Sequence, residues 1–192
     1  MAKKRTTART IKKKKKKWYK VVAPPEFKNL TLGETPASDI SEVKGRIFKI
    51  SLMNLTNDLK KQNIVISFKT LDNSSQSEIK TESIKYEINK VHIKRLVRKG
   101  KGKIDDSFVI ETKDKVKVRI KPLLLTRNKT QHNVMTAIRW GAREFIQKEA
   151  DEKKFSELLM SVVQTDLQRR LKKALKKIYP ISISEIRILQ KL

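Results

Sequence analysis

The sequence predicts an α+β domain in which a curled, barrel-like antiparallel β-sheet is flanked by C-terminal helices and preceded by a disordered basic N-terminal arm. In several stretches between residues 45 and 121, apolar and polar residues alternate with a period of two, which is typical of half-buried strands. After residue 126, apolar residues recur at helical spacing. Residues 1–17 contain a lysine run that cannot bury apolar surface. We therefore expect a basic extension over residues 1–17 and a single domain over residues 18–192.

The first part of the domain is predicted to consist of strands. Trp18 and Tyr19 follow the basic arm and are expected to begin the first strand and enter the core, with stacking on bases as the alternative. Pro24 and Pro25 favour an extended path. The segment Gly-Glu-Thr-Pro at residues 33–36 favours a turn. Alternation then predicts three strands, at residues 48–52, 64–68 and 78–88, with a turn at 72–76.

A short basic helix is predicted next, with Asn89 as its N-cap and Gly100 as its C-cap. Ile93, Leu96 and Val97 recur at helical spacing, so one face of this helix can pack while the basic residues between them project elsewhere. A loop of glycine and lysine then leads into a strand at residue 104. The basic segment is therefore expected to be anchored at both ends.

The remainder is predicted to be a hairpin, two helices and a closing strand. Pro122 is expected to end the alternation of the hairpin, and the three leucines after it are expected to be buried. A second proline, Pro180, is expected to end the last helix. The predicted elements are a hairpin of residues 108–110 with 116–120, a helical stripe over 134–145, a break at 151–154, a helix over 155–179 and a strand over 181–188.

Charge restricts the class of partner. The 192 residues include 47 Lys and Arg against 20 Asp and Glu, which gives a formal net charge of +27. The first 20 residues hold eleven basic residues and no acidic one, and removing those eleven charges leaves +16 for the body. Such an excess repels itself and favours a polyanionic partner, with nucleic acid ahead of an anionic membrane surface. No stretch approaches the roughly 20 apolar residues of a membrane span, and the N-terminus lacks the apolar core of a signal peptide, which predicts a cytoplasmic location.

The predicted docking site for this polyanion is the stretch from residue 91 to residue 106. There an apolar helical stripe adjoins a dense run of cations. A surface helix with lysines for solubility is the alternative, but basic runs without acidic partners on a packed helix are costly because they repel one another. The lysine run of the arm is expected to order only against phosphate. The candidate RNA-binding residues are Lys3, Lys4, Arg5, Arg9, Lys12, Lys13, Lys14, Lys15, Lys16, Lys17, Trp18, Lys94, Arg95, Arg98, Lys99, Lys101, Lys103, Arg127, Lys129 and Arg139.

No combination of residues predicts catalysis, a metal site or a cofactor. The chain has no cysteine, which excludes disulfides and thiolate metal sites, and its two histidines lie far apart. The Gly-Lys-Gly-Lys segment lacks the spacing and the Ser or Thr of a phosphate-binding loop. Asp105 and Asp106 are adjacent and point to opposite faces of a strand, so we expect a strand-entry turn or a local partner for Arg98 instead of a magnesium site. An RNA-modifying enzyme is therefore disfavoured.

Six short motifs in order resemble the small-subunit ribosomal protein family S3Ae, also called eS1, in its archaeal-like form. The resemblance covers nearly the whole chain, and the order and spacing of the motifs make it specific. The motifs are W-Y-x-V-x-A-P from Trp18, G-E-T-P-A from Gly33, N-L-T from Asn54 with K-Q from Lys61, R-L-V-R-K-G from Arg95 with I-D from Ile104, T-K-D from Thr112 with V-R from Val118, and K-I-Y-P from Lys177 with E-I-R from Glu185.

The resemblance implies a structural constituent of the small ribosomal subunit, on the platform near the 3′ end of the small-subunit ribosomal RNA and the messenger exit. The implied partners are that RNA and neighbouring ribosomal proteins, with messenger RNA and initiation factors as further candidates, and with no cofactor, membrane or small-molecule substrate. A free RNA chaperone or ribosome-assembly factor is the alternative. The matched positions imply that Arg95, Arg98 and Lys99 face RNA, that Trp18 marks where the arm meets the fold, and that Tyr179 and Pro180 are structural.

Overall fold

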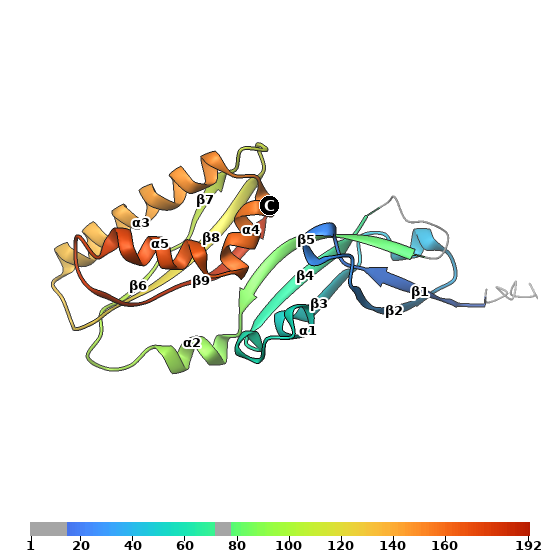
Figure 1. Cartoon of the computed structure of the whole chain (residues 1–192), viewed down its shortest axis with the longest axis horizontal. Coiled ribbons are helices and arrows are strands. Elements are labelled where there is room, and N and C mark those ends of the chain that lie inside the picture. The colour runs from blue at the N-terminus through green and yellow to red at the C-terminus, as the bar shows by residue number, and fades with distance from the viewer. Residues whose placement is uncertain (1–14, 72–77) are drawn as a thin grey trace, which may run out of the picture.

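A computed structural model describes residues 15–71 and 78–192 and confirms the predicted α+β class (Figure 1). The arm before residue 15 and the turn predicted at residues 72–76 lie outside the described residues. The strands are β1 (Lys17–Val22), β2 (Thr31–Ala37), β3 (Ile47–Ser51), β4 (Ile64–Thr70), β5 (Glu78–Ile88), β6 (Lys103–Asp105), β7 (Phe108–Glu111), β8 (Lys117–Thr126) and β9 (Ile181–Lys191). The α-helices are α1 (Leu52–Thr56), α2 (Lys90–Leu96), α3 (His132–Glu152), α4 (Phe155–Val163) and α5 (Asp166–Leu175).

The strands form one nine-stranded sheet that stays open instead of closing into a barrel. Its main path is β2-β1-β5-β9-β8-β6, with β4 and β3 added beside β5, and β7 beside β8. All pairings are antiparallel except that between β1 and β5. The long strand β5 pairs with β1 near its beginning and with β9 near its end. It therefore joins an N-terminal lobe, β1 to β4 with α1, to a C-terminal lobe, β6 to β9 with α3 to α5 (Figure 1).

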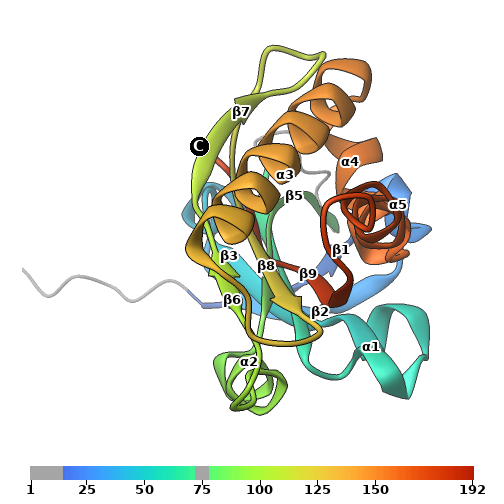
Figure 2. The same ribbon diagram turned by 90° about the vertical axis from the view of Figure 1, so that its left-hand side faces the viewer.

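The main core lies between the sheet and the helices of the C-terminal lobe. In both views α3, α4 and α5 lie together against the sheet, whereas α2 lies apart from them (Figures 1 and 2). Ile138, Leu159 and Leu167 from the three helices join Ile120 and Leu189 from the sheet in one buried cluster, which continues into the N-terminal lobe. A smaller cluster under β1 and β2 contains Tyr19, Ala37, Val43 and Ile79. Among the described residues, no helix is both long enough and apolar enough to cross a membrane.

The two aromatic residues after the arm have different environments. Both lie in β1, as predicted, but neighbouring residues of a strand point to opposite faces. Tyr19 is 8% exposed and belongs to the smaller core cluster, whereas Trp18 is 69% exposed. The expectation that both enter the core therefore holds for Tyr19 alone. The extended path predicted for the prolines ends at Pro24, because Pro25 begins a short 3-10 helix, η1 (Pro25–Phe27).

Strand β2 overturns the turn predicted at residues 33–36. This segment pairs with β1 along its length, with Pro36 opposite Trp18 and Gly33 opposite Val21. The strand lies at the edge of the sheet, where a proline without an N–H is tolerated. Gly33 has a φ of +148°, a conformation that residues with side chains rarely adopt, beside an irregularity in the pairing. The turn-forming residues therefore belong to an irregular edge strand.

Two predicted boundaries were also wrong, whereas the prediction for Pro122 is confirmed. Helix α2 ends at Leu96, before the expected C-cap Gly100. The alternation of exposed and buried residues ends at Pro122 and the three leucines after it are buried, although β8 itself continues, because the register with β9 shifts there and accommodates the missing N–H. The helix predicted over residues 155–179 is divided into α4 and α5 at Thr165, whose φ of +65° interrupts the helical path. A smooth apolar stripe does not reveal such a single-residue break.

Candidate nucleic-acid interface

Helix α2 carries the first cations of the predicted docking site. Its start is the one predicted, because the side chain of Asn89 accepts a hydrogen bond of 3.0 Å from the backbone N–H of Val91. Ile93 is buried in the main core and fixes one face of the helix. Lys94 and Arg95 are exposed in its last turn, where cations interact favourably with the helix dipole. The short helix is therefore held by one apolar anchor and one cap.

The loop that follows α2 is fastened at its far end to the C-terminal lobe. The N–H of Gly102 donates to the hydroxyl oxygen of Thr126 over 2.8 Å, and the N–H of Thr126 donates to the carbonyl of Gly102 over 3.0 Å. A Cβ at Gly102 would lie 2.8 Å from that hydroxyl oxygen, so this contact requires glycine. Lys101 Nζ also donates to the hydroxyl of Ser182 over 2.9 Å. These bonds, between segments far apart in sequence, hold the loop in place.

Thr126 brings a second basic loop to the same place. Its fully buried hydroxyl donates to the carbonyl of Asn128 over 2.6 Å, and the N–H of Arg127 donates to the carbonyl of Pro180 over 3.0 Å. Figure 1 shows the loops after α2 and before α3 at the same end of the C-terminal lobe. We call this surface the basic end, and its cations are Lys94, Arg95, Arg98, Lys99, Lys101, Lys103, Arg127 and Lys129.

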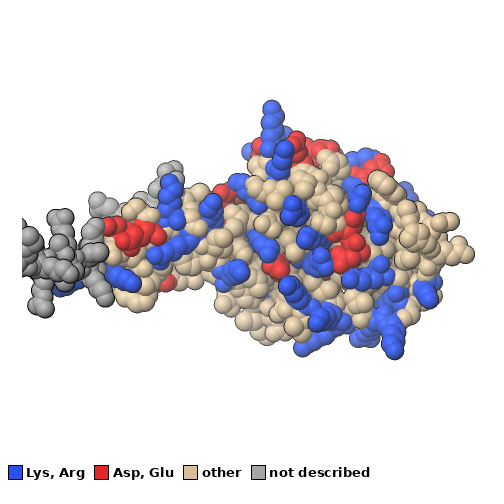
Figure 3. All heavy atoms as spheres, turned by 180° about the vertical axis from the view of Figure 1, so that it is seen from behind, with Lys and Arg blue, Asp and Glu red and all other residues tan. Residues whose placement is uncertain are grey.

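Most cations of the basic end have no acidic partner. Arg95, Arg98 and Lys99 are exposed and make no ion pair with any residue in the described ranges, and the same holds for Arg127 and Lys129. Seen from behind, the molecule carries Lys and Arg side chains scattered over the larger lobe, between uncharged areas and some Asp and Glu, with groups along its lower edge (Figure 3). Unpaired cations on an anchored loop are available to an external polyanion.

The two acidic residues beside the loop are paired with arginines from distant segments of the chain. Asp105 accepts from Arg187 over 2.8 Å and lies 3.2 Å from Lys103 Nζ. Asp106 accepts two bonds from Arg143, of 2.6 and 2.8 Å, and this pairing holds the pKa of its carboxyl below the ordinary value. The prediction that these aspartates are local partners of Arg98 was therefore wrong. The predicted divergence of the two carboxylates is confirmed, since one bonds to a strand and the other to α3.

The remaining candidate residues lie on the N-terminal lobe, on α3 or outside the described residues. Lys15, Lys16 and Lys17 lead into β1 on the N-terminal lobe, away from α2 (Figure 1). Arg139 lies on α3, close enough for its charge to lower the pKa of Asp106, and its half-buried side chain leaves Nε without a hydrogen bond among the described residues. The candidates Lys3, Lys4, Arg5, Arg9, Lys12, Lys13 and Lys14 lie outside the described residues.

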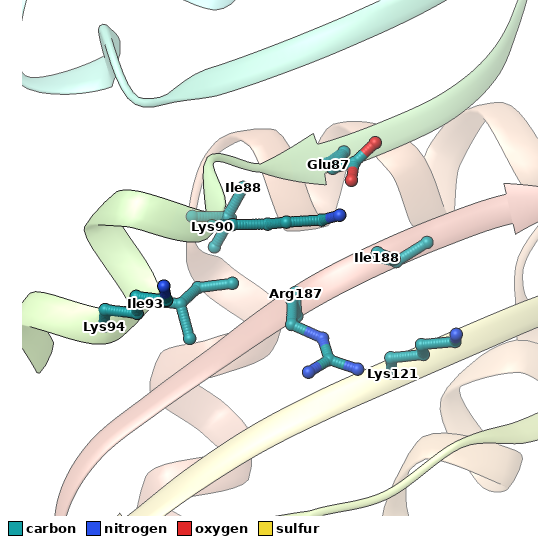
Figure 4. Close-up of a pocket in the computed structure, with 8 residues that line it drawn as sticks. All are labelled: Glu87, Ile88, Lys90, Ile93, Lys94, Lys121, Arg187 and Ile188. Carbon is teal, nitrogen blue, oxygen red and sulfur yellow. The ribbon is translucent and has the colours of Figure 1, made fainter. Parts of the chain in front are cut away.

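A basic groove next to α2 was missed by the sequence analysis. A cavity of about 480 Å³ lies between α2, the end of β5 and the strands β8 and β9 (Figure 4). Isoleucines line it together with four cations and the single carboxylate of Glu87, which is already paired with Lys85. The cations are Lys90, Lys94, Lys121 and Arg187. The alternation of β8 indicates that Lys121 points outward, but no local sequence pattern indicates that α2 approaches β9.

Glu185 of β9 is a half-buried carboxylate in the C-terminal lobe. Burial raises the pKa of the Glu185 carboxyl, and burial with the nearby Glu185 raises the pKa of the Tyr86 hydroxyl. Among residues 15–71 and 78–192, no group of three or more His, Asp or Glu side chains is arranged to hold a metal ion.

Comparison with known proteins adds an independent finding. The model of the Ribosomal S3Ae family matches residues 3–191. A protein named small ribosomal subunit protein eS1 from Saccharolobus solfataricus is 36% identical over 173 residues, which span 90% of this chain and 83% of the relative. A protein of the same name from Haloquadratum walsbyi is 30% identical over 181 residues, which span 93% of this chain and 85% of the relative. The similarity thus extends over both lobes.

Proposed function

Since the chain belongs to the ribosomal S3Ae family and is a protein of the small ribosomal subunit, we propose that its basic end binds the ribosomal RNA of that subunit. The family identity makes it a structural component and not an enzyme. The observation that carries the proposal is the set of exposed, unpaired cations on a loop anchored through Gly102 and Thr126. RNA phosphates supply the negatively charged partners that these cations do not have within the described part of the protein.

The mode of recognition follows from the chemistry of the basic end. Lysine and arginine contacts to phosphate position a protein on RNA without reading its sequence. A-form helices hide their base edges in a deep, narrow groove, so specificity comes from the shape of the folded RNA. The anchored loop offers charges at fixed spacing, and the groove beside α2 extends them with Lys90, Lys121 and Arg187. In this proposal the arm contributes further phosphate contacts between RNA helices.

We also propose that the protein lies on the platform of a cytoplasmic small subunit, near the 3′ end of its RNA and the messenger exit, beside other ribosomal proteins. The support for this placement is the family membership of the chain. Contacts with messenger RNA and initiation factors are part of the same proposal. A map of native small subunits that places the chain away from the platform contradicts it.

Salt dependence of binding tests the basic end. Because binding releases counterions, log K falls linearly as the logarithm of the salt concentration rises. The slope is about −0.7 per neutralised phosphate on single strands and about −0.9 on a duplex. Replacing Arg95, Arg98 and Lys99 by alanine is expected to flatten the slope by about 2 on a fragment of small-subunit ribosomal RNA. A matched control removes three exposed lysines, Lys113, Lys115 and Lys154, that lie around the β7–β8 turn and the α3–α4 junction. Equal slopes for both triple variants would show that binding is diffuse and that the loop is not the contact.

Sedimentation distinguishes a resident protein from a free RNA chaperone or assembly factor. A resident component migrates with small subunits at a ratio of about one to one after a moderate-salt wash, because many phosphate contacts must break together. A transient factor is lost in the wash. Loss of the unsubstituted chain from washed subunits therefore contradicts the proposed function.

A further inference from the structure

An exposed tryptophan on α3 lies in an arrangement that the basic end does not explain. Trp140 is 62% exposed, although it lies on a helix whose other large apolar side chains face the core. The guanidinium carbon of Arg143 lies 5.2 Å from the centre of the Trp140 ring and 5.6 Å from that of Phe108. Arg143 is also held by two hydrogen bonds to Asp106. The tryptophan is thus oriented by a fixed stack, although most of its surface is in solvent.

A cavity of about 410 Å³ lies beside this stack. It is lined by Phe108, Trp140 and Arg143, with Glu144 and Gln147 at its polar side. The Arg143 charge is compensated by Asp106, whose side chain is only 12% exposed. The cavity therefore has aromatic walls and one carboxylate, and the cation among the described residues that line it, Arg143, is compensated. Phosphate has no partner here.

The helix that carries Trp140 differs in charge from the rest of the molecule. Residues 136–151 of α3 carry three cations and three carboxylates, whereas the chain as a whole carries +27. Lys148 is paired with Glu144 over 2.8 Å, and the side-chain amide of Gln147 donates to Asp151 over 2.9 Å. The exposed Glu144 pair is weak and exchangeable, since both side chains are about 70% exposed. A partner's cation can therefore replace Lys148.

The surface formed by Phe108, Trp140, Arg143, Glu144 and Gln147 is called the Trp140 face. We propose that it binds a neighbouring protein of the small subunit through a lysine or arginine side chain. The aliphatic stem of that side chain packs against Phe108, and its charge lies over the open face of Trp140 beside Glu144. Aromatic rings attract cations at their faces, and tryptophan with arginine is enriched at the energetic centres of protein interfaces. The proposal rests on membership of the small subunit, and it gives the molecule two surfaces: a basic end for RNA and a neutral aromatic face for protein. Stacking of a nucleobase on Trp140 is the competing outcome.

Site-specific crosslinking in assembled small subunits tests this proposal. Trp140 is replaced by the photoreactive amino acid p-benzoylphenylalanine. Trp18, the other tryptophan, is 69% exposed and receives the same replacement as a matched control. We expect residue 140 to crosslink to a protein, at a segment that contains lysine or arginine. A crosslink from residue 140 to RNA, or none where residue 18 does crosslink, overturns the proposal.

A competition experiment gives a second readout. Trp140→Ala and Trp18→Ala chains are each mixed with the unsubstituted chain during subunit assembly, and incorporation is measured by mass spectrometry. We expect Trp140→Ala to be under-represented about tenfold or more, as for a residue at the centre of an interface, and Trp140→Phe to recover part of the loss. Equal incorporation of Trp140→Ala and the unsubstituted chain contradicts the proposal. Failure of the unsubstituted chain itself to enter subunits is a separate result that contradicts the proposed function.

Discussion

Asp106 is a carboxylate whose charge is compensated within the fold. Two short bonds from Arg143 hold it against α3, so this acidic residue next to the basic loop does not compete with an external polyanion. Its neighbour Asp105 is occupied in the same way by Arg187. The sequence predicted that the two carboxylates diverge, but their partners lie 37 and 82 residues away. Local spacing cannot identify partners that only the packing of distant segments brings near.

Replacing Asp106 by asparagine is expected to lower the free energy of unfolding at pH 7 by about 1–3 kcal/mol, since a partly buried, charge-assisted pair is lost. The pKa of the Asp106 carboxyl is lowered in the folded protein by its bond to Arg143. Its stabilising effect is therefore present above the ordinary carboxyl pKa and is lost as the pH falls through the lowered value. Urea unfolding of both proteins at pH 7 and at a series of pH values below the ordinary aspartate pKa of about 3.9 checks this.

The control for this prediction is Asp114→Asn, which removes the same charge from an exposed turn where Asp114 makes no ion pair among the described residues. Its effect is expected to be within about 0.5 kcal/mol at every pH. If the Asp106→Asn difference is the same at acidic and neutral pH, the ion pair is not its cause.

Among the elements, α2 and the junction of α4 with α5 show what periodicity can and cannot predict. The start of α2 was predictable because an asparagine cap is a local signal, and Asn89 makes the expected bond. The break at Thr165 was not predictable, because the apolar stripe continues on both sides of it without interruption. A threonine with a φ of +65° is an unfavourable choice for this conformation, because its branched side chain crowds the backbone.

Replacing Thr165 by glycine is expected to raise the free energy of unfolding by about 0.5–1 kcal/mol, since the strain of the left-handed conformation exceeds the entropy that glycine loses on folding. The Thr165 side chain makes no capping hydrogen bond to α5, so the substitution removes no bond of that kind. Urea denaturation measures the change. As a control, Ala137→Gly on the exposed face of α3 is expected to lower stability by about 1 kcal/mol. A loss of stability at both positions would show that Thr165 is not strained.

At the scale of the whole molecule, the excess of positive charge dominates the behaviour of the free protein. A net charge of +27 on 192 residues repels itself in the compact state. Screening by salt reduces this repulsion. The same salt weakens the contacts with RNA phosphate. The free and RNA-bound protein should therefore respond to salt in opposite directions.

Thermal unfolding tests this expectation. Between about 50 and 300 mM salt, over which the Debye length shortens from roughly 14 Å to roughly 6 Å, the Tm of the free protein is expected to rise by about 2–4 °C, which corresponds to about 1 kcal/mol for a chain of this size. With a ribosomal RNA fragment present, the Tm is expected to fall over the same range as the RNA dissociates. A fall in the Tm of the free protein would mean that internal ion pairs such as Arg143 with Asp106 outweigh the repulsion.

The sequence by itself determined the class of partner, the α+β class and most of the strands, because net charge and residue periodicity are local or additive properties. The motifs from Trp18 to Glu185 also indicated the family, which the comparisons confirmed. The tertiary structure alone decided which cations share a surface. Thr126 joins two loops, α2 closes a groove against β9, and Arg143 orients Trp140. Each of these contacts depends on the pairing register and crossing of segments that are distant in sequence, and no local pattern records that geometry.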